Sequence, residues 1–564
     1  MRALLAPLWA QSNLNLYMVL SSLLIHILGL TSTIFVMLVY GRYLAHGIDS
    51  TLYTLAMGAL IGIGIEILLR RARYKIAAAL CAAESRKLSE KVSHVLLNAR
   101  SGALQSHLNS PDIGGGTTSW LERIGQAVSP QPILALLDMP FALLLLGVLF
   151  LLSWELALCA LFVVCVLLIF LGVSVHRIKA VTEHHQLAQG QFNSLLKNTE
   201  LTEVVRINNA QDWLAQRLSD DSGESRVSKH ALQLQQEKIQ SQVRSATMFM
   251  SVVIISIGAA LSVHGDLNFG LLIGANILSA RLIVLISQPI QQVPTWLNAI
   301  ESFKNVEAFL DLPEETQRGT KLPTYLGKLS FKQVMFSYPN APLMVYENLN
   351  FELEEGECLM VTGSNGKGKT TLARLITGLV QPMRGSISID GVELRQVNAR
   401  WWREQLVYLP QDPDLLPGTL RENMSLIDSS IDDAQILAAL HRVQLGGWIE
   451  QHPEGLDMII QQRGRNLALG IRRRIAFARA LLTQGQLVVV DEPLEGLDKE
   501  GISMMQRVLG ELEKEKRTLI VISQFTQPLK AGAKYINLDE RHVMQISSAH
   551  PKATSGSLEK GALV

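Results

Sequence analysis

One segment of the chain has the residue types and spacing of a phosphate-binding loop. Residues 363–370 read Gly-Ser-Asn-Gly-Lys-Gly-Lys-Thr and match the pattern G-x-x-x-x-G-K-S/T at every position. The glycines let backbone N–H groups close around the β- and γ-phosphates, Lys369 can reach the terminal phosphates, and the Thr370 hydroxyl can ligate Mg²⁺. The chemistry indicated is binding of ATP together with Mg²⁺. The predicted nucleotide-binding residues of this segment are Gly363, Ser364, Asn365, Gly366, Lys367, Gly368, Lys369, Thr370 and Thr371.

Two adjacent carboxylates follow an apolar run and could supply the other half of this chemistry. Residues 488–492 read Val-Val-Val-Asp-Glu. We expect Asp491 to hold Mg²⁺ through water and Glu492 to polarise the attacking water as a catalytic residue. An acid pair alone could be no more than an exposed strand end, and Lys367 could simply point to solvent. Together with the phosphate loop, the acid pair predicts ATP hydrolysis.

These residues need a strand before the loop and a helix after it. The apolar residues 358–362 predict that strand, and residues 370–379 predict the helix. Further short β-branched runs at 488–490 and 519–522 alternate with helical segments such as 473–482. This alternation predicts an α/β domain in which helices wrap a parallel sheet.

The first half of the chain has a different composition. The 564 residues are 48% apolar and only 18% charged, whereas a typical soluble protein has about 25% charged residues. About 20 apolar helical residues cross a hydrocarbon core of roughly 30 Å. A buried core helix could account for one such apolar stretch but not for six. The six stretches therefore predict six membrane spans. The stretches are residues 16–39, 52–69, 133–153, 156–175, 248–263 and 269–290.

Charge sets the expected orientation of the spans and limits the partners. Basic residues follow the second span at Arg70, Arg71, Arg73 and Lys75, whereas the connectors 154–155 and 264–268 have no Lys or Arg. The long connections after the second and fourth spans are therefore expected to be cytoplasmic and to extend the spans as helices. A formal net charge of +1 gives no support to a nucleic-acid partner.

The combination resembles an ABC exporter half-transporter over about residues 15–545. Tyr338, in Phe-Ser-Tyr-Pro, matches the aromatic residue that stacks on adenine, and Gln411, in Leu-Pro-Gln-Asp, matches the glutamine that couples the site to the membrane helices. Residues 417–423 resemble the stretch that follows the Gln411 loop in exporters, and residues 475–480 resemble the helix after the family signature. The resemblance implies an all-α six-helix transmembrane domain of the ABC exporter type followed by an α/β P-loop ATPase domain. It also implies Mg²⁺ held by Thr370, Gln411 and Asp491.

We expect an N-terminal segment at residues 1–14, a transmembrane domain at 15–312, a linker at 313–327, the ATP-binding cassette domain at 328–546 and a flexible tail at 547–564. The first span is expected to be retained rather than cleaved as a signal peptide.

The chain departs from the family pattern in three segments. The signature Leu-Ser-Gly-Gly-Gln is Leu-Ala-Leu-Gly-Ile at residues 467–471, so Ala468 replaces the serine that donates to the γ-phosphate and Leu469 replaces a glycine. Gln524 stands at the position of the switch histidine and is predicted to serve as a catalytic residue that donates to phosphate without a titratable proton. Gln462 replaces a glutamate. These departures imply a slow homodimer or the degenerate half of a heterodimer.

Two membrane segments resemble those of type I secretion exporters, namely residues 138–141 (Asp-Met-Pro-Phe) and 274–281. This resemblance implies a multi-pass protein of the bacterial inner membrane, in contact with lipid, that joins a second half-transporter, a periplasmic membrane-fusion adaptor and an outer-membrane channel to export a protein or peptide. A lipid or small-molecule exporter half, or a weakly hydrolysing regulatory subunit, remains open as an alternative. The intramembrane charges Asp138 and Arg281 are either functional groups or internally paired structural ones.

Overall fold

The computed structural model describes residues 12–44, 49–108, 116–197, 202–265, 267–315, 317, 319–338, 341, 343–524 and 533–539. The chain divides into two compact units, one made of Met1–Asn98 with His107–Leu312 and the other of Ala99–Ser106 with Pro313–Val564. The expected flexible tail and most of the N-terminal segment lie outside the described residues. The other predicted domain boundaries stay predictions, and each unit is considered separately below.

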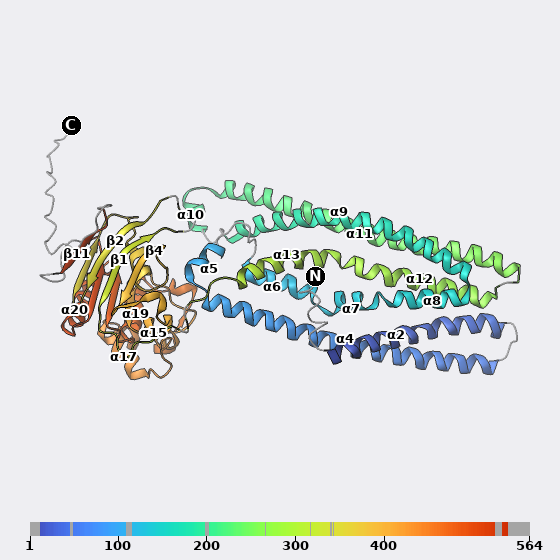
Figure 1. The fold of residues 1–564 in the computed structure, drawn as a ribbon, viewed down its shortest axis with the longest axis horizontal. Helices are drawn as coiled ribbons and strands as arrows, with labels where there is room; N and C mark the ends of the chain where they lie inside the picture. The colour runs from blue at the N-terminus through green and yellow to red at the C-terminus, as the bar shows by residue number, and fades with distance from the viewer. Residues whose placement is uncertain are drawn as a thin grey trace, which may run out of the picture. The chain divides into compact units, whose positions relative to one another are not determined.

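The first unit is built of long helices that run alongside one another (Figure 1). Within the described residues, six helical segments are long and apolar enough to cross a membrane, which confirms the six predicted spans. The expectation of helical extensions is also confirmed, because α9 and α11 continue without interruption for 44 and 53 residues and pack against each other. The helices are α2 (Ser12–Leu38), the π-helix η1 (Val39–Tyr43), α4 (Asp49–Asn98), α6 (Gly116–Ala127), α7 (Pro130–Asp138), α8 (Phe141–Leu152), α9 (Trp154–Lys197), α10 (Thr202–Ile207), α11 (Gln211–Val263), α12 (Phe269–Gln291) and α13 (Val293–Leu310).

The third span differs from the single helix that its apolar run predicts. Helix α7 ends at Asp138 and α8 starts at Phe141, with a turn at Met139 and Pro140 between them. Proline lacks an N–H and its ring clashes with the preceding turn, so a helix breaks where proline falls inside it. The break leaves Asp138 at the end of a helix, inside the unit.

Small residues allow α2 to pack closely on its neighbours. A Cβ added to Gly62 of α4 would lie 2.9 Å from Thr31 of α2, and a Cβ on Gly270 of α12 would collide with the Met37 carbonyl oxygen. Helix α12 also packs against α8 and α11 around a core that contains Leu278 and Ile283. The membrane unit is therefore held by close backbone approach as well as by apolar burial.

The second unit contains a five-stranded parallel sheet in the order β11-β3-β10-β9-β6. Every residue of β3, β9 and β10 is buried, as expected for strands covered on both faces, and the predicted parallel α/β sheet is confirmed. A four-stranded antiparallel sheet, β2-β1-β4-β5, and the small pair β7-β8 accompany it. The strands are β1 (Leu329–Phe336), β2 (Tyr346–Leu353), β3 (Cys358–Thr362), β4 (Arg384–Ile389), β5 (Val392–Glu393), β6 (Leu406–Leu409), β7 (Gly418–Thr419), β8 (Ile459–Ile460), β9 (Leu487–Asp491), β10 (Thr518–Ile522) and β11 (Lys534–Asn537).

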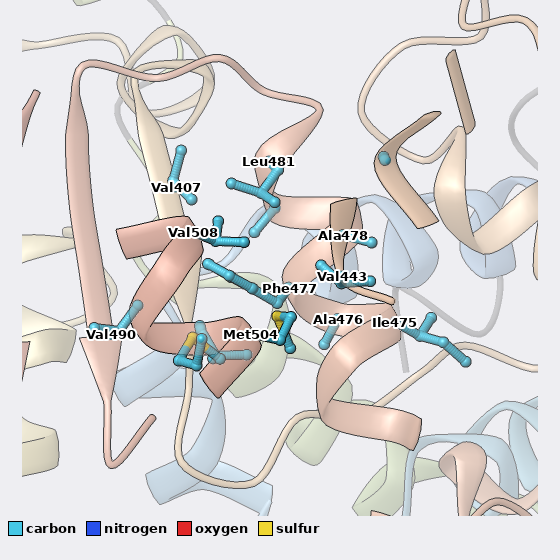
Figure 2. Packing of buried hydrophobic residues seen from close by; sticks show 14 of the residues in the cluster. Val407, Val443, Ile475, Ala476, Phe477, Ala478, Leu481, Val490, Met504 and Val508 are labelled. Atoms are coloured by element: carbon cyan, nitrogen blue, oxygen red, sulfur yellow. The ribbon is translucent and has the colours of Figure 1, made fainter. Parts of the chain in front are cut away.

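Helices cover the parallel sheet and form a buried core with it. Figure 2 shows Phe477 of α19 close to Met504 and Val508 of α20, with Val407 of β6 and Val490 of β9 nearby, and all five side chains are fully buried. This core fixes α19 against the strand that ends in Asp491. The helices of this unit are α14 (Lys369–Ile376), α15 (Ala399–Glu404), α16 (Leu420–Met424), α17 (Asp433–Arg442), α18 (Gly446–Gln451), α19 (Leu469–Leu481) and α20 (Lys499–Lys514), with short 3-10 turns η3 (Leu394–Gln396), η4 (Gly455–Asp457) and η5 (Gln462–Gly464). Helix α5 (Ser101–Leu108) belongs to this unit up to Ser106.

Candidate nucleotide site

The predicted phosphate loop lies between β3 and α14, in the strand–loop–helix setting that the motif requires. Gly366 has φ +81°, and a Cβ added there would meet nothing within 4 Å, so the loop opens to free space at this point. Gly368 precedes the first residue of α14 with φ +97°, and a Cβ there would lie 2.6 Å from Val345. These glycines shape a loop that leaves room for phosphate at the helix N-terminus.

Two residues that the sequence did not single out hold this loop from outside. The buried Tyr346 hydroxyl donates to the Gly368 carbonyl oxygen at 2.6 Å. Both carboxylate oxygens of Asp539 accept from the Ser364 N–H, each at 3.1 Å, and this backbone hydrogen bond, together with the nearby Lys367, lowers the pKa of Asp539. Neither residue belongs to the loop motif, and only the pairing of β1 with β2 and of β3 with β11 brings them to it.

Three of the predicted polar residues meet directly. The Lys369 ammonium donates to the Gly363 carbonyl at 2.8 Å and lies 3.1 Å from Glu492 Oε1, with both charged side chains less than a tenth exposed. The other oxygen of Glu492 accepts from the Gln524 N–H at 3.3 Å, and the Gln524 side-chain amide donates to Asn365 Oδ1 at 2.7 Å. Lysine, glutamate and glutamine therefore converge on the phosphate loop. The Lys369 ammonium and the Glu492 carboxylate form an ion pair at this loop.

Asp491 has the properties of a cation ligand. The residue is 1% exposed, and neither carboxylate oxygen has a well-aligned hydrogen bond within the described part of the chain. Burial raises the pKa of Asp491, and the nearby Thr370 hydroxyl, followed by Lys369, offsets this only in part. Hard oxygen ligands of this kind suit Mg²⁺, so Asp491 and Thr370 fit the predicted ion.

Tyr338 lies beside the start of α14, as a residue that contacts the base would. Its hydroxyl is 3.2 Å from the Thr371 hydroxyl and accepts from Arg374 at 3.3 Å. Its ring meets that of Phe336 edge to face, with ring centroids 5.0 Å apart. The half-buried ring is thereby fixed next to the phosphate loop, and its stacking on adenine stays a prediction.

Gln411 makes a different contact from the one expected of a metal ligand. Its side-chain amide donates to Glu495 Oε2 at 3.1 Å, in the turn after Glu492. This hydrogen bond directs the Gln411 side chain to Glu495 and not to Thr370 or Asp491. The role of Gln411 in holding Mg²⁺ therefore stays a prediction. Glu495 was not singled out from the sequence, since nothing local distinguishes it from any exposed acid.

Comparison with known proteins bears on both units. The family model of the ABC transporter transmembrane region matches residues 16–286, and that of the ABC transporter matches residues 346–495, which together make up well over half of the chain. A solved bacterial Atm1-family ABC exporter with ATP bound shares the fold, with a TM-score of 0.74, 19% identity, and coverage of 93% of this chain and 94% of that one. The chain is an ABC exporter half-transporter. Its ATPase domain is that of an ABC transporter.

The half-transporter is also similar to curated bacterial proteins named leukotoxin translocation ATP-binding protein LktB. The proteins of Mannheimia haemolytica and Bibersteinia trehalosi are each 30% identical to it over 301 residues. The match includes 53% of this chain and 42% of each relative, so less than half of the relatives' length is matched.

The segment expected to be the signature region leads into α19 (Leu469–Leu481). Ala468 occupies the N-cap of α19 and supplies no side-chain cap. Leu469 is 41% exposed, and a Cβ on Gly496 would lie 2.8 Å from its side chain, so Leu469 rests on a turn that has room for it only because residue 496 is glycine. The start of α19 therefore presents a leucine and no hydroxyl.

Both intramembrane charged side chains have hydrogen-bond partners within the membrane unit. Arg73 of α4 donates to both carboxylate oxygens of Asp138, at 2.6 and 3.1 Å, and to the Ser22 hydroxyl at 2.7 Å. Arg281 of α12 donates to the Gly29 carbonyl and, at 2.7 Å, to the Ser32 hydroxyl of α2. These contacts favour the structural alternative for both residues.

Proposed function

We propose that this half-transporter exports a protein or peptide across the bacterial inner membrane as part of a type I secretion system. The observation that carries the proposal is its similarity to proteins named for leukotoxin translocation. The Asp-Met-Pro-Phe segment at 138–141, at the break between α7 and α8, supports it. In such a system, a second half-transporter, a periplasmic membrane-fusion adaptor and an outer-membrane channel are the partners. The ATPase domain faces the cytoplasm.

The proposed ATP chemistry starts from the contacts of Lys369 and Glu492. Lys369 exchanges Glu492 and the Gly363 carbonyl for the β- and γ-phosphates, which releases Glu492 to polarise the attacking water. Asp491 and Thr370 would hold Mg²⁺, which supplies neutralising charge on the phosphates. Gln524 already reaches Asn365 of the phosphate loop and is placed to donate to a phosphate oxygen.

We also propose that the chain is the degenerate half of a heterodimer. In a homodimer, each ATP would face Ala468 and Leu469 of the other copy, with no hydroxyl donor and a leucine side chain in the way. The loss of one oriented donor costs about 3 kcal/mol in comparable sites. A partner with an intact signature would instead complete the site formed by Lys369 and Glu492, and co-expression with a neighbouring half-transporter should allow the two to copurify.

The experiment is deletion of the gene, followed by comparison of the secreted proteins. We expect one secreted protein or peptide to disappear, to return with the wild-type gene, and to stay absent with Lys369→Ala or Glu492→Gln. Lys499→Ala and Glu500→Gln, at exposed positions of α20, are matched controls that should restore secretion.

Other outcomes would support the alternatives. Unchanged secretion combined with new sensitivity to a drug or a lipid would favour a lipid or small-molecule exporter. Full secretion with both Lys369→Ala and Glu492→Gln would mean that the chain is a regulatory subunit, because its own ATP site would then be dispensable.

A further inference from the structure

A buried arginine behind the nucleotide site joins three separate loops. The Arg473 side chain, in the second turn of α19, is 3% exposed. One terminal nitrogen donates to the Glu492 carbonyl at 2.9 Å and to the Glu495 carbonyl, and the other donates to the Gln411 carbonyl. The second nitrogen also donates to Glu495 Oε2 at 3.2 Å. These carbonyls come from the loop after β6, the end of β9 and the turn before α20.

The first of these contacts falls on a backbone that requires support. Glu492 has φ +47°, a left-handed conformation that a non-glycine residue adopts only when its surroundings enforce it. Its N–H donates to the Ile522 carbonyl at 2.8 Å, and its own carbonyl accepts from Arg473. The residue is thus fixed on both sides, and this backbone directs the carboxylate to Lys369 and to the Gln524 N–H.

The remaining contacts tie the Gln411 loop to the same arginine. Glu495 Oε2 accepts both from the Gln411 side chain at 3.1 Å and from Arg473. The Gln411 carbonyl is bound directly. A displacement of the Gln411 loop would therefore act on the Arg473 guanidinium, and through it on the Glu492 carbonyl.

We propose that Arg473 is a positioning residue that keeps Glu492 in its left-handed conformation and couples the Gln411 loop to it. The planar, permanently charged guanidinium suits this role because it presents several donors in fixed directions, whereas a lysine ammonium is a single point of contact. Arg473 does not touch the reacting atoms, so its effect is on the orientation of Glu492.

The test uses the full-length chain in lipid nanodiscs and single-turnover hydrolysis of ATP, which is measurable even for a slow enzyme. Arg473→Met removes all donors at similar length. The matched control is Arg472→Met, on the same turn, which removes an arginine with an 11% exposed side chain whose partner is the exposed Asp412. ATP affinity, melting temperature and the effect of Glu492→Gln in each background are measured alongside.

We expect Arg473→Met to lower the hydrolysis rate on the order of tenfold to a hundredfold, with ATP affinity within about threefold of the wild type. Glu492→Gln should then reduce the rate much less in the Arg473→Met background than in the wild type or in Arg472→Met, because a misoriented carboxylate already contributes little to hydrolysis. If Arg473→Met does not fold, Arg473→Lys is used instead, which keeps the charge and has fewer donors. It should also lower the hydrolysis rate and weaken the effect of Glu492→Gln, but by smaller factors. Unchanged hydrolysis, or a full effect of Glu492→Gln in the Arg473 variants, would overturn the proposal.

Discussion

Replacing Asp138 by asparagine tests whether the charges in the membrane unit are structural. Arg73 and Asp138 are 5% and 6% exposed and share two hydrogen bonds, at 2.6 and 3.1 Å. His26 Nε2 lies 3.5 Å from the same carboxylate, so α2, α4 and α7 all meet at this point. Asp138→Asn leaves the Arg73 guanidinium buried without its counter-charge. Breaking a buried pair in this way costs about 3–5 kcal/mol of unfolding free energy.

The assay is reversible chemical denaturation of the full chain in mixed lipid–detergent micelles, arranged as a double-mutant cycle. Arg73→Met should cost about as much as Asp138→Asn, because the carboxylate is then the unpaired charge. The double variant Arg73→Met with Asp138→Leu should regain most of the lost unfolding free energy, to within about 2 kcal/mol of the wild-type value. Glu90→Gln, which removes an exposed pair with Arg86 at 2.9 Å on the same helix, is the control and should cost less than about 1 kcal/mol.

Two results would refute this reasoning. One is an Asp138→Asn variant as stable as Glu90→Gln, because loss of a pair this deeply buried should lower the free energy of unfolding by much more than loss of an exposed pair. The other is a double variant no more stable than either single variant, because the loss would then come from packing at the α7–α8 break rather than from an uncompensated charge.

Further predictions concern the nucleotide site and helix packing. Tyr346→Phe leaves the Gly368 carbonyl without its donor, and we expect a cost of about 1–3 kcal/mol, measured as a lower melting temperature and weaker ATP binding by titration. Burial raises the pKa of Asp491, so the folded ATPase domain binds more protons than the unfolded chain between the ordinary aspartate pKa and the raised value. In Mg²⁺-free, nucleotide-free buffer the stability of the domain should therefore fall as pH rises through that window. The denaturation midpoint should show this fall for the wild type and not for Asp491→Asn. The same dependence of the midpoint on pH in both proteins would contradict the raised pKa of Asp491. Gly270→Ala should prevent α12 from packing on α2, because its Cβ would collide with the Met37 carbonyl, and reduced yield of folded protein would show this.

The parts of the structure that local sequence determines were predictable. The phosphate loop requires a strand before it and a helix after it, so Lys369 could be placed from eight residues. Glu492 and Gln524 follow buried β-branched strands, and the carboxyl ends of parallel strands meet at one edge of a sheet. The six spans followed from length and apolarity alone.

The residues and pairings that escaped prediction depend on distant parts of the chain. Tyr346 and Asp539 reach the phosphate loop through sheet pairing, and no motif marks either of them. Arg73 and Asp138 are 65 residues apart, and a charge inside an apolar run does not disclose its partner. The antiparallel sheet was not predicted because its strands carry exposed polar residues, as β2 does, and lack the continuous apolar runs that indicate buried strands.

We propose that this half-transporter has an intact catalytic side and a degenerate signature side. The most direct measurement is the steady-state ATPase rate of the chain purified alone, compared with that of Ala468→Ser combined with Leu469→Gly. The wild-type homodimer should hydrolyse ATP slowly, and the double variant should be faster by about a hundredfold, since one oriented donor is restored and the obstructing leucine is removed. A wild-type homodimer that hydrolyses ATP at the rate of an ordinary exporter, or a double variant no faster than the wild type, would show that the signature side is not degenerate.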